Sequence, residues 1–187
     1  MKESSFALAA LAAVAFMQPP QAAGADDAKQ IYPADKAARG KYIVTTSGCN
    51  DCHTPWKMGA AGPEPDMSRM LSGHPQDMAL PPAPKPVGPW LVSAAATNTA
   101  WSGPWGVSFT ANLTPDRDTG LGKWTQRNFT ETIRTGRHMG RGRPILPPMP
   151  IPMYKHFTDA DLEAIFAFLQ SIPPVKNKVP EPLPPAE

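Results

Sequence analysis

The 25 prolines of this 187-residue chain are clustered, and their positions limit where regular structure can form. Proline breaks helix interiors and central strands, because it lacks an N–H group and its ring clashes with the preceding turn. Ten prolines lie in 55–104, which excludes a helical bundle or a large regular sheet there. Helices are therefore expected in the long proline-free windows, which are 34–54, 116–143 and 153–172.

Each window contains one segment with helix signals, at 34–47, 125–136 and 158–172. The second and third begin with a threonine able to cap the first turn, Thr125 and Thr158. The third also has acidic residues in its first turn and an apolar stripe along one face. The first two end before glycines and the third before a pair of prolines, so three helices are predicted.

The remaining chain predicts extended loop with one β-hairpin. Strands at 94–101 and 107–113 flank a Ser-Gly-Pro-Trp-Gly turn, near the end of a proline- and glycine-rich segment at 59–107. We expect a single domain over 26–176, mainly α in class, with 59–107 as an insertion. The proline-rich end, 177–187, predicts an extended tail without a core of its own.

The first 25 residues have the order of a secretory signal peptide. A charged start at Lys2 precedes a short apolar run over 6–17 and a small-residue Ala23-x-Ala25 pattern. The alternative is an uncleaved amphipathic or anchoring helix. Because no later apolar run is long enough to span a bilayer, we expect an exported protein that is soluble or at most tethered.

The formal net charge is +2, but 116–155 holds eight Lys and Arg against three acidic residues, a surplus of five. This modest basic region is far from a nucleic-acid footprint. It suits docking to an acidic partner surface, and a solvated face without a partner is an equal alternative.

The chemistry of the chain is concentrated at 49–53, where Cys49-Asn-Asp-Cys52-His53 forms the C-x-x-C-H pattern of c-type haem attachment. Two thiols one helical turn apart can each bond to one of the two vinyl groups on a porphyrin edge. The imidazole that follows can then bind the iron. With only two cysteines, the chain has neither a multi-disulfide scaffold nor a four-thiolate zinc or iron–sulfur site.

Three other interpretations of this motif are open. A thioredoxin-like redox pair requires a βαβ setting, which the sequence does not indicate. A zinc site requires a fourth ligand nearby. A structural disulfide leaves His53 unexplained. An exported chain whose only two cysteines fall in this pattern favours one covalently bound haem.

The sixth iron ligand decides the kind of haem protein. Met149 is the leading candidate, because Pro147-Pro-Met-Pro150 gives it the stiff, extended backbone that a weak thioether ligand needs. Met153 follows, and His138 and His156 are further candidates.

Several motifs together resemble class I c-type cytochromes, over 34–58 and 108–176, and the closest likeness is to cytochrome c electron-transfer subunits of periplasmic dehydrogenases. The motifs, in chain order, are Arg-Gly-Lys-Tyr at 39–42, Gly-Cys-x-x-Cys-His-Thr-Pro at 48–55, Asn-Leu-Thr-Pro-Asp at 112–116, Thr-Gly-Leu-Gly-Lys-Trp-Thr at 119–125, Arg-Thr-Gly-Arg at 134–137, Pro-Met-Pro at 148–150, and Thr-Asp-x-Asp-Leu through Ile-Pro-Pro at 158–174.

The resemblance implies a small cytochrome c fold of three or more helices around one haem c. It implies His53 and Met149 as the iron ligands, and Gly40 packing near Phe166 or Phe168 where the terminal helices cross. It also implies a non-enzymatic electron carrier in the periplasm, taking single electrons from a donor dehydrogenase to an acceptor oxidase or cytochrome.

Two alternatives to the electron carrier follow from the residues. One is a haem enzyme or gas-binding cytochrome with a vacant or displaceable sixth position, where 59–107 builds a substrate pocket. The other is a redox or interaction protein without haem.

Five further residues have weaker assignments. Trp124 and Trp90 are expected to pack in the core or at the haem edge. Arg137, Arg141 and Arg143 can bind haem propionates, contribute to the basic docking face, or be solvated loop residues.

Overall fold

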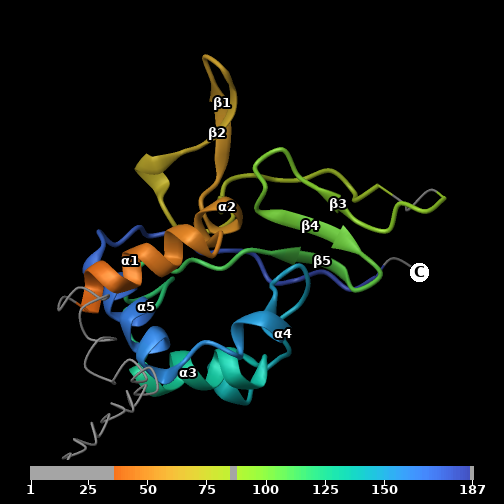
Figure 1. Cartoon of the computed structure of the whole chain (residues 1–187). Coiled ribbons are helices and arrows are strands. Elements are labelled where there is room, and N and C mark those ends of the chain that lie inside the picture. The colour runs from red at the N-terminus through yellow and green to blue at the C-terminus, as the bar shows by residue number, and fades with distance from the viewer. Residues whose placement is uncertain (1–35, 85–87, 186–187) are drawn as a thin grey trace, which may run out of the picture. The chain divides into compact units, whose positions relative to one another are not determined.

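The computed structural model describes residues 36–84 and 88–185, so the expected signal peptide at 1–25 lies outside the described residues. Figure 1 shows helices and short antiparallel strands joined by long loops. The elements, in chain order, are α1 (Lys36–Thr46), α2 (Cys49–His53), β1 (Trp56–Gly59), β2 (Gly62–Pro65), the 3₁₀ helix η2 (Met67–Arg69), β3 (Ser93–Ala94), β4 (Ala100–Gly103), β5 (Gly106–Phe109), α3 (Gln126–Thr135), the 3₁₀ helix η3 (His138–Gly140), α4 (Ile151–Tyr154) and α5 (Asp159–Ser171).

The helices predicted in the proline-free windows are confirmed as α1, α3 and α5. Thr125 caps α3 by accepting a hydrogen bond from the Asn128 N–H at 3.1 Å, and the Asn128 side chain accepts one from the Thr125 N–H at 3.1 Å. Gly136 ends this helix with a φ of 66°. Thr158 caps α5 by accepting from the Asp161 N–H at 3.1 Å. Local sequence signals therefore determine where these helices begin and end.

Helices α1 and α5 lie against each other (Figure 1). Their backbones come into direct contact at Gly40. A Cβ atom at Gly40 would lie 1.9 Å from the Ala164 carbonyl oxygen and 2.8 Å from the Phe168 Cβ. Only glycine fits such an approach, which confirms the expected packing of Gly40 and assigns it to Phe168 rather than Phe166.

The apolar core lies among α1, α3 and α5. Trp124, Met149 and Tyr154 are partly buried against it. Its buried members come mainly from the apolar stripes of these helices and are Ile43, Val44, Leu71, Leu121, Phe129, Ile133, Leu162, Ala164, Ile165, Phe168, Leu169 and Ile172.

The predicted hairpin at 94–113 forms, but its first strand is divided. Strands β4 and β5 pair antiparallel and close around Pro104 and Trp105. The expected continuous strand over 94–101 is wrong, because the chain turns back between β3 and β4. Asn98 adopts a left-handed φ of 54° in this turn, and the Ala95 N–H donates to the Ala100 carbonyl at 2.9 Å.

The β1–β2 hairpin was not predicted, because β2 contains Pro63 and Pro65. In a two-stranded ribbon each strand has a free edge, and proline is tolerated where no ladder hydrogen bond is needed. The two prolines pair in register with Met58 and Trp56.

Over 177–185 the proline-rich tail forms no helix and is attached to the rest of the domain. Asn177 is 1% exposed. Leu183 and Val107 exchange two backbone hydrogen bonds of 2.9 Å, so the tail pairs with the edge of β5 opposite β4. Within 36–84 and 88–185, no helix has the length and apolar character needed to cross a membrane.

Candidate haem site

The C-x-x-C-H motif forms a helix of its own, α2. Gly48 has a left-handed φ of 73°, which separates α2 from the end of α1. Cys49 and Cys52 lie one turn apart on α2, both partly buried and neither in a disulfide. The structure therefore presents two unoxidised thiols at the spacing that attachment to a porphyrin edge requires.

His53 ends α2 with its imidazole only 8% exposed. Its Nδ1–H donates to the Ala111 carbonyl oxygen at 2.8 Å, which leaves Nε2 as the unprotonated nitrogen. Burial lowers the pKa of His53, and the bond to Ala111 opposes that shift. A neutral imidazole with one nitrogen held by a backbone carbonyl is the usual form of a histidine metal ligand, so His53 fits haem iron.

A tightly packed loop fixes the backbone behind His53. The Gly73 N–H donates to the His53 carbonyl at 2.8 Å, and the Leu71 N–H donates to the buried Thr54 hydroxyl at 2.9 Å. Gly73 has a φ of 78°, and a Cβ there would lie 2.4 Å from the Thr110 carbonyl oxygen. The segment 71–73, from within 59–107, thus lies against the backbone that carries His53 and its acceptor Ala111.

Tyr154 of α4 lies beside the two thiols. Its hydroxyl donates to the Ser47 carbonyl. Burial, with added repulsion from Cys49 and Cys52, raises the pKa of Tyr154 to about 12, and burial likewise raises that of Cys49 to about 11. The Cys49 thiol is therefore neutral near pH 7 and a poor nucleophile toward oxidants.

A pocket of about 400 Å³ opens next to this tyrosine. It lies between the end of α1 and the segment that contains α4. Its lining residues are Thr46, Ser47, Pro150, Met153, Tyr154 and Phe157.

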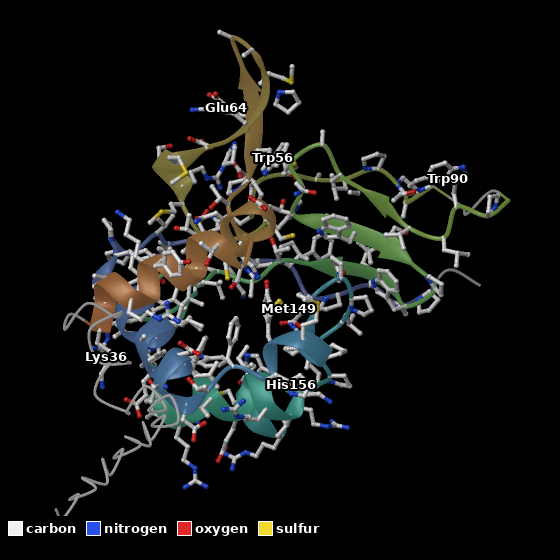
Figure 2. All side chains as sticks on the ribbon, viewed as in Figure 1. Lys36, Trp56, Glu64, Trp90, Met149 and His156 are labelled. Carbon is white, nitrogen blue, oxygen red and sulfur yellow. The ribbon has the colours of Figure 1, made fainter. Side chains whose placement is uncertain are left out.

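Among the four candidates for a sixth ligand, the structure separates Met149 from the others. Met149 is partly buried against the apolar core, in the loop that leads into α4 (Figure 2). Met153 is 72% exposed, and both His138 and His156 are exposed. The peptide bond between Pro147 and Pro148 is cis.

Of the two tryptophans expected to pack in the core or at the haem edge, only one packs against the core. Trp124 packs against the core, and its ring meets His138 edge-on at 5.1 Å between centroids. Core packing of Trp90 is wrong, because this residue is 77% exposed and projects from the loop before β3 (Figure 2). Two of the arginines have partners within the chain: the Arg137 side chain donates to the Gly142 carbonyl at 3.0 Å, and the Arg143 guanidinium lies 3.6 Å from the Glu181 carboxylate in the tail.

Sequence reasoning missed two residues of the site. Ala111 acts through its backbone carbonyl, which every residue has, so its side chain carries no signal; its one marker is the Asn-Leu-Thr-Pro motif that follows it. Tyr154 reaches Ser47 across 107 positions of sequence, and no local pattern predicts such a contact.

The geometry also bears on the alternative interpretations of the motif. The strands of the described residues pair antiparallel, unlike the parallel strands of a βαβ redox domain. Over 36–84 and 88–185, no three His, Cys, Asp or Glu side chains are grouped as metal ligands, so the zinc interpretation finds no ligand set there.

Comparison with known proteins gives the same assignment. Residues 37–173 match the family described as cytochrome c. The chain is similar to the cytochrome c subunit of a quinone alcohol dehydrogenase from Gluconobacter oxydans, at 28% identity over 82% of this chain and 26% of that protein. It resembles a nicotinate dehydrogenase subunit from Pseudomonas putida, at 34% identity over 46% of this chain and 7% of that protein.

A third relative is the gluconate 2-dehydrogenase cytochrome c subunit of Pantoea cypripedii, at 27% identity over 73% of this chain and 23% of that protein. The chain thus spans about a quarter or less of the length of these three relatives. The family match covers most of the described chain, including α2, the loop with Ala111, and Met149. With its C-x-x-C-H helix and its buried, carbonyl-bound histidine, the chain belongs to the cytochrome c family.

Proposed function

We propose that this protein is a single-haem electron carrier with His53 and Met149 as the axial ligands of the iron. The observation that carries the proposal is the buried His53, whose Nδ1–H is bound to the Ala111 carbonyl at 2.8 Å one position after the second cysteine of the motif. One C-x-x-C-H motif and two cysteines in the sequence support one haem.

Haem c supplies an iron ion that alternates between the ferrous and ferric states and so accepts and releases single electrons. Cys49 and Cys52 would hold the group covalently through their sulfur atoms. The Ala111 carbonyl orients the His53 ring and increases the basicity of Nε2. Met149 would hold the group from a proline-rich backbone, whose stiffness would limit movement of this side chain.

The relatives support a place in a dehydrogenase system, because three of the similar proteins are named as dehydrogenase subunits. We therefore infer that this chain is not itself a catalyst but takes electrons from a donor dehydrogenase and passes them to an acceptor oxidase or cytochrome. The motif order of residues 1–25 supports a signal peptide and a periplasmic location for the single domain expected over 26–176.

The basic region is the proposed docking face for an acidic partner. Arg137, Arg141 and Arg143 are exposed on the loop around and after η3. Such a face predicts that electron transfer with the partner slows as ionic strength rises, because salt screens exposed charges.

Absorption spectroscopy of the purified, full-length holoprotein tests the proposal. We expect one covalently bound haem per chain, a sharp low-spin ferrous spectrum, and a ferric charge-transfer band from methionine sulfur to iron. Met149→Ala should abolish the charge-transfer band. Met153→Ala is the matched control, since Met153 is 72% exposed and should leave the band intact.

Three results would reject parts of the proposal. A chain purified without covalent haem rejects the cofactor. A high-spin ferric spectrum with rapid carbon monoxide binding by the reduced protein favours the haem enzyme or gas-binding alternative. A band lost in Met153→Ala but kept in Met149→Ala transfers the ligand assignment to Met153.

A further inference from the structure

We propose that one short segment, β5 and its continuation to residue 111, positions both axial ligands, and that Ser108 is the positioning residue on the methionine side. This inference rests on the proposed function, because it takes Met149 as the distal ligand. Ser108 and Ala111 directly follow 59–107, the segment whose purpose the sequence left open, and Trp105 and Val107 at its end hold Ser108 and β5 in place.

The proline strap, residues 147–150, has few ways to be held by hydrogen bonds. Three of its four residues are prolines, which have no N–H donor. Its backbone carbonyls are therefore its main attachment points. Those of Met149 and Pro150 accept bonds from the first turn of α4, which follows directly in the chain. The Pro147 carbonyl is bonded from elsewhere in the fold.

Ser108 provides that bond. Its hydroxyl donates to the Pro147 carbonyl at 2.6 Å, two residues before Met149. Among the described residues, no other side chain hydrogen-bonds to the proline strap. Ser108 is 7% exposed, so water competes little for this bond, and a serine here is expected to contribute more than one on the surface.

The hydroxyl of Ser108 is itself oriented. The Trp105 indole N–H donates to Ser108 Oγ at 3.3 Å. The hydroxyl hydrogen of Ser108 has two acceptors in reach, the Pro147 carbonyl at 2.6 Å and the Trp101 carbonyl at 3.4 Å, and the much shorter contact selects Pro147. The strand that contains Ser108, β5, is held along both edges. Strand β4 pairs with one edge, and Leu183 exchanges hydrogen bonds with Val107 on the other. Ser108 is therefore a rigidly placed donor.

The same segment reaches the opposite ligand three residues later. Ala111 accepts the Nδ1–H of His53 at 2.8 Å. A chain of four residues, 108–111, thus contacts His53 at one end and the strap of Met149 at the other. Because it is anchored by β4 and by the tail, the relative placement of the two ligands depends on this strand.

Imidazole binding by the ferric holoprotein tests the proposal, since imidazole competes with the methionine for iron. In Ser108→Ala we expect imidazole affinity to rise roughly fivefold to tenfold, the equivalent of one lost buried hydrogen bond. Ser108→Thr keeps a hydroxyl and should restore an affinity close to that of the wild type. Ser93→Ala, an exposed serine of β3 in the same sheet, should change nothing.

A second variant covers the case in which Ser108→Ala does not fold. Trp105→Phe keeps an aromatic ring but removes the indole N–H that donates to Ser108. It should raise imidazole affinity by about twofold to threefold, less than the effect of losing a full hydrogen bond. Guanidinium unfolding of each variant separates a local effect from a general loss of stability.

Wild-type imidazole affinity in both Ser108→Ala and Trp105→Phe would overturn the role of Ser108 while leaving Met149 as ligand. Absence of the methionine charge-transfer band from the wild-type protein would overturn both proposals, and that result is seen before any Ser108 variant is made. If Ser108→Thr binds imidazole as tightly as Ser108→Ala does, the packing around residue 108, and not its hydroxyl group, positions the proline strap.

Discussion

The interior among α1, α3 and α5 is apolar, whereas the interior among the loops after α2 is built from hydroxyl, amide and imidazole groups. In the helical interior, buried Leu, Ile and Phe side chains fill space. In the loop interior the buried polar residues are Thr54, Ser72, His74, Thr97, Thr99, Asn112, Thr114 and Asn177. The first is stabilised by apolar area removed from water. The second is stabilised by hydrogen bonds between most of its buried polar groups, with the Ser72 hydroxyl unpaired among the described residues.

Asn177 illustrates how the loop interior is closed. Its side-chain N–H groups donate to the carbonyls of Ser72 at 2.7 Å and His74 at 2.9 Å, and its carbonyl oxygen accepts from the Gln76 N–H at 2.9 Å. One amide thus joins the tail to a loop about a hundred residues earlier. The two interiors should therefore fail in different ways when changed.

The largest effect is expected at the helix crossing, from Gly40→Ala. Helix propensity alone would make this change stabilising by about 1 kcal/mol. The clash with the Ala164 carbonyl at 1.9 Å should instead cost about 3 kcal/mol or more, because two helix backbones must separate. Guanidinium unfolding of the holoprotein measures whether the free energy of unfolding rises or falls. A stabilised Gly40→Ala protein would show that the crossing is looser than described; Ala38→Gly, on the exposed face of α1, should cost only about 1 kcal/mol.

The next effect is in the loop interior, from Asn177→Ala. This change leaves two carbonyls and one N–H without partners, and should lower the free energy of unfolding by about 2–3 kcal/mol. Lys176→Ala, at the exposed neighbouring position, should stay within about 0.5 kcal/mol of the wild type. Equal stabilities for these two variants would mean that the polar interior contributes little.

A smaller effect concerns pH and the buried His74. In the neutral ring, Nε2–H makes a long contact with the Met78 carbonyl at 3.4 Å and Nδ1 accepts from the Thr99 hydroxyl at 2.9 Å. Burial, with a minor contribution from Arg69, lowers its pKa below the ordinary 6.5. The unfolded chain therefore binds the proton first as the pH falls.

The contribution of His74 to stability is thus fully present above about pH 6.5 and decreases below it, by at most about 1.4 kcal/mol per pH unit. His74→Gln should flatten the dependence of unfolding free energy on pH between 7 and 5. The same slope in both proteins would place the acid sensitivity in other groups.

The smallest effect is expected from the exposed ion pair that joins α1 to α5, Lys36 with Glu163 at 2.8 Å. Both side chains are largely exposed, so Lys36→Ala should change stability by less than about 0.5 kcal/mol. A larger loss, abolished by high salt, would show that charge as well as apolar packing holds the two helices together.

The two interiors also differ in how far the sequence predicts them. The caps Thr125 and Thr158 and the stripe of α5 are local or periodic, so the helices could be placed from the sequence. The C-x-x-C-H motif is equally local, so the two thiols and the histidine could be singled out from the sequence, although the separate helix α2 and the burial of His53 were not predicted. Asn177, Ser108 and Ala111 form hydrogen bonds with partners 39 to 105 positions away. No repeating pattern in the sequence indicates such pairs.

The long sequence separation of these contacts has a consequence for synthesis of the protein. The core of α1, α3 and α5 extends to Ile172, and the loop at 72–76 is closed by Asn177. A nascent chain therefore cannot complete the helical interior before residue 172, or the loop interior before residue 177, has been made. Contacts between distant segments also form slowly, because a large loop must be closed first. The segment with Cys49 and Cys52 therefore cannot reach its packed form, with Tyr154 of α4 beside the two thiols, until nearly the whole domain has been made.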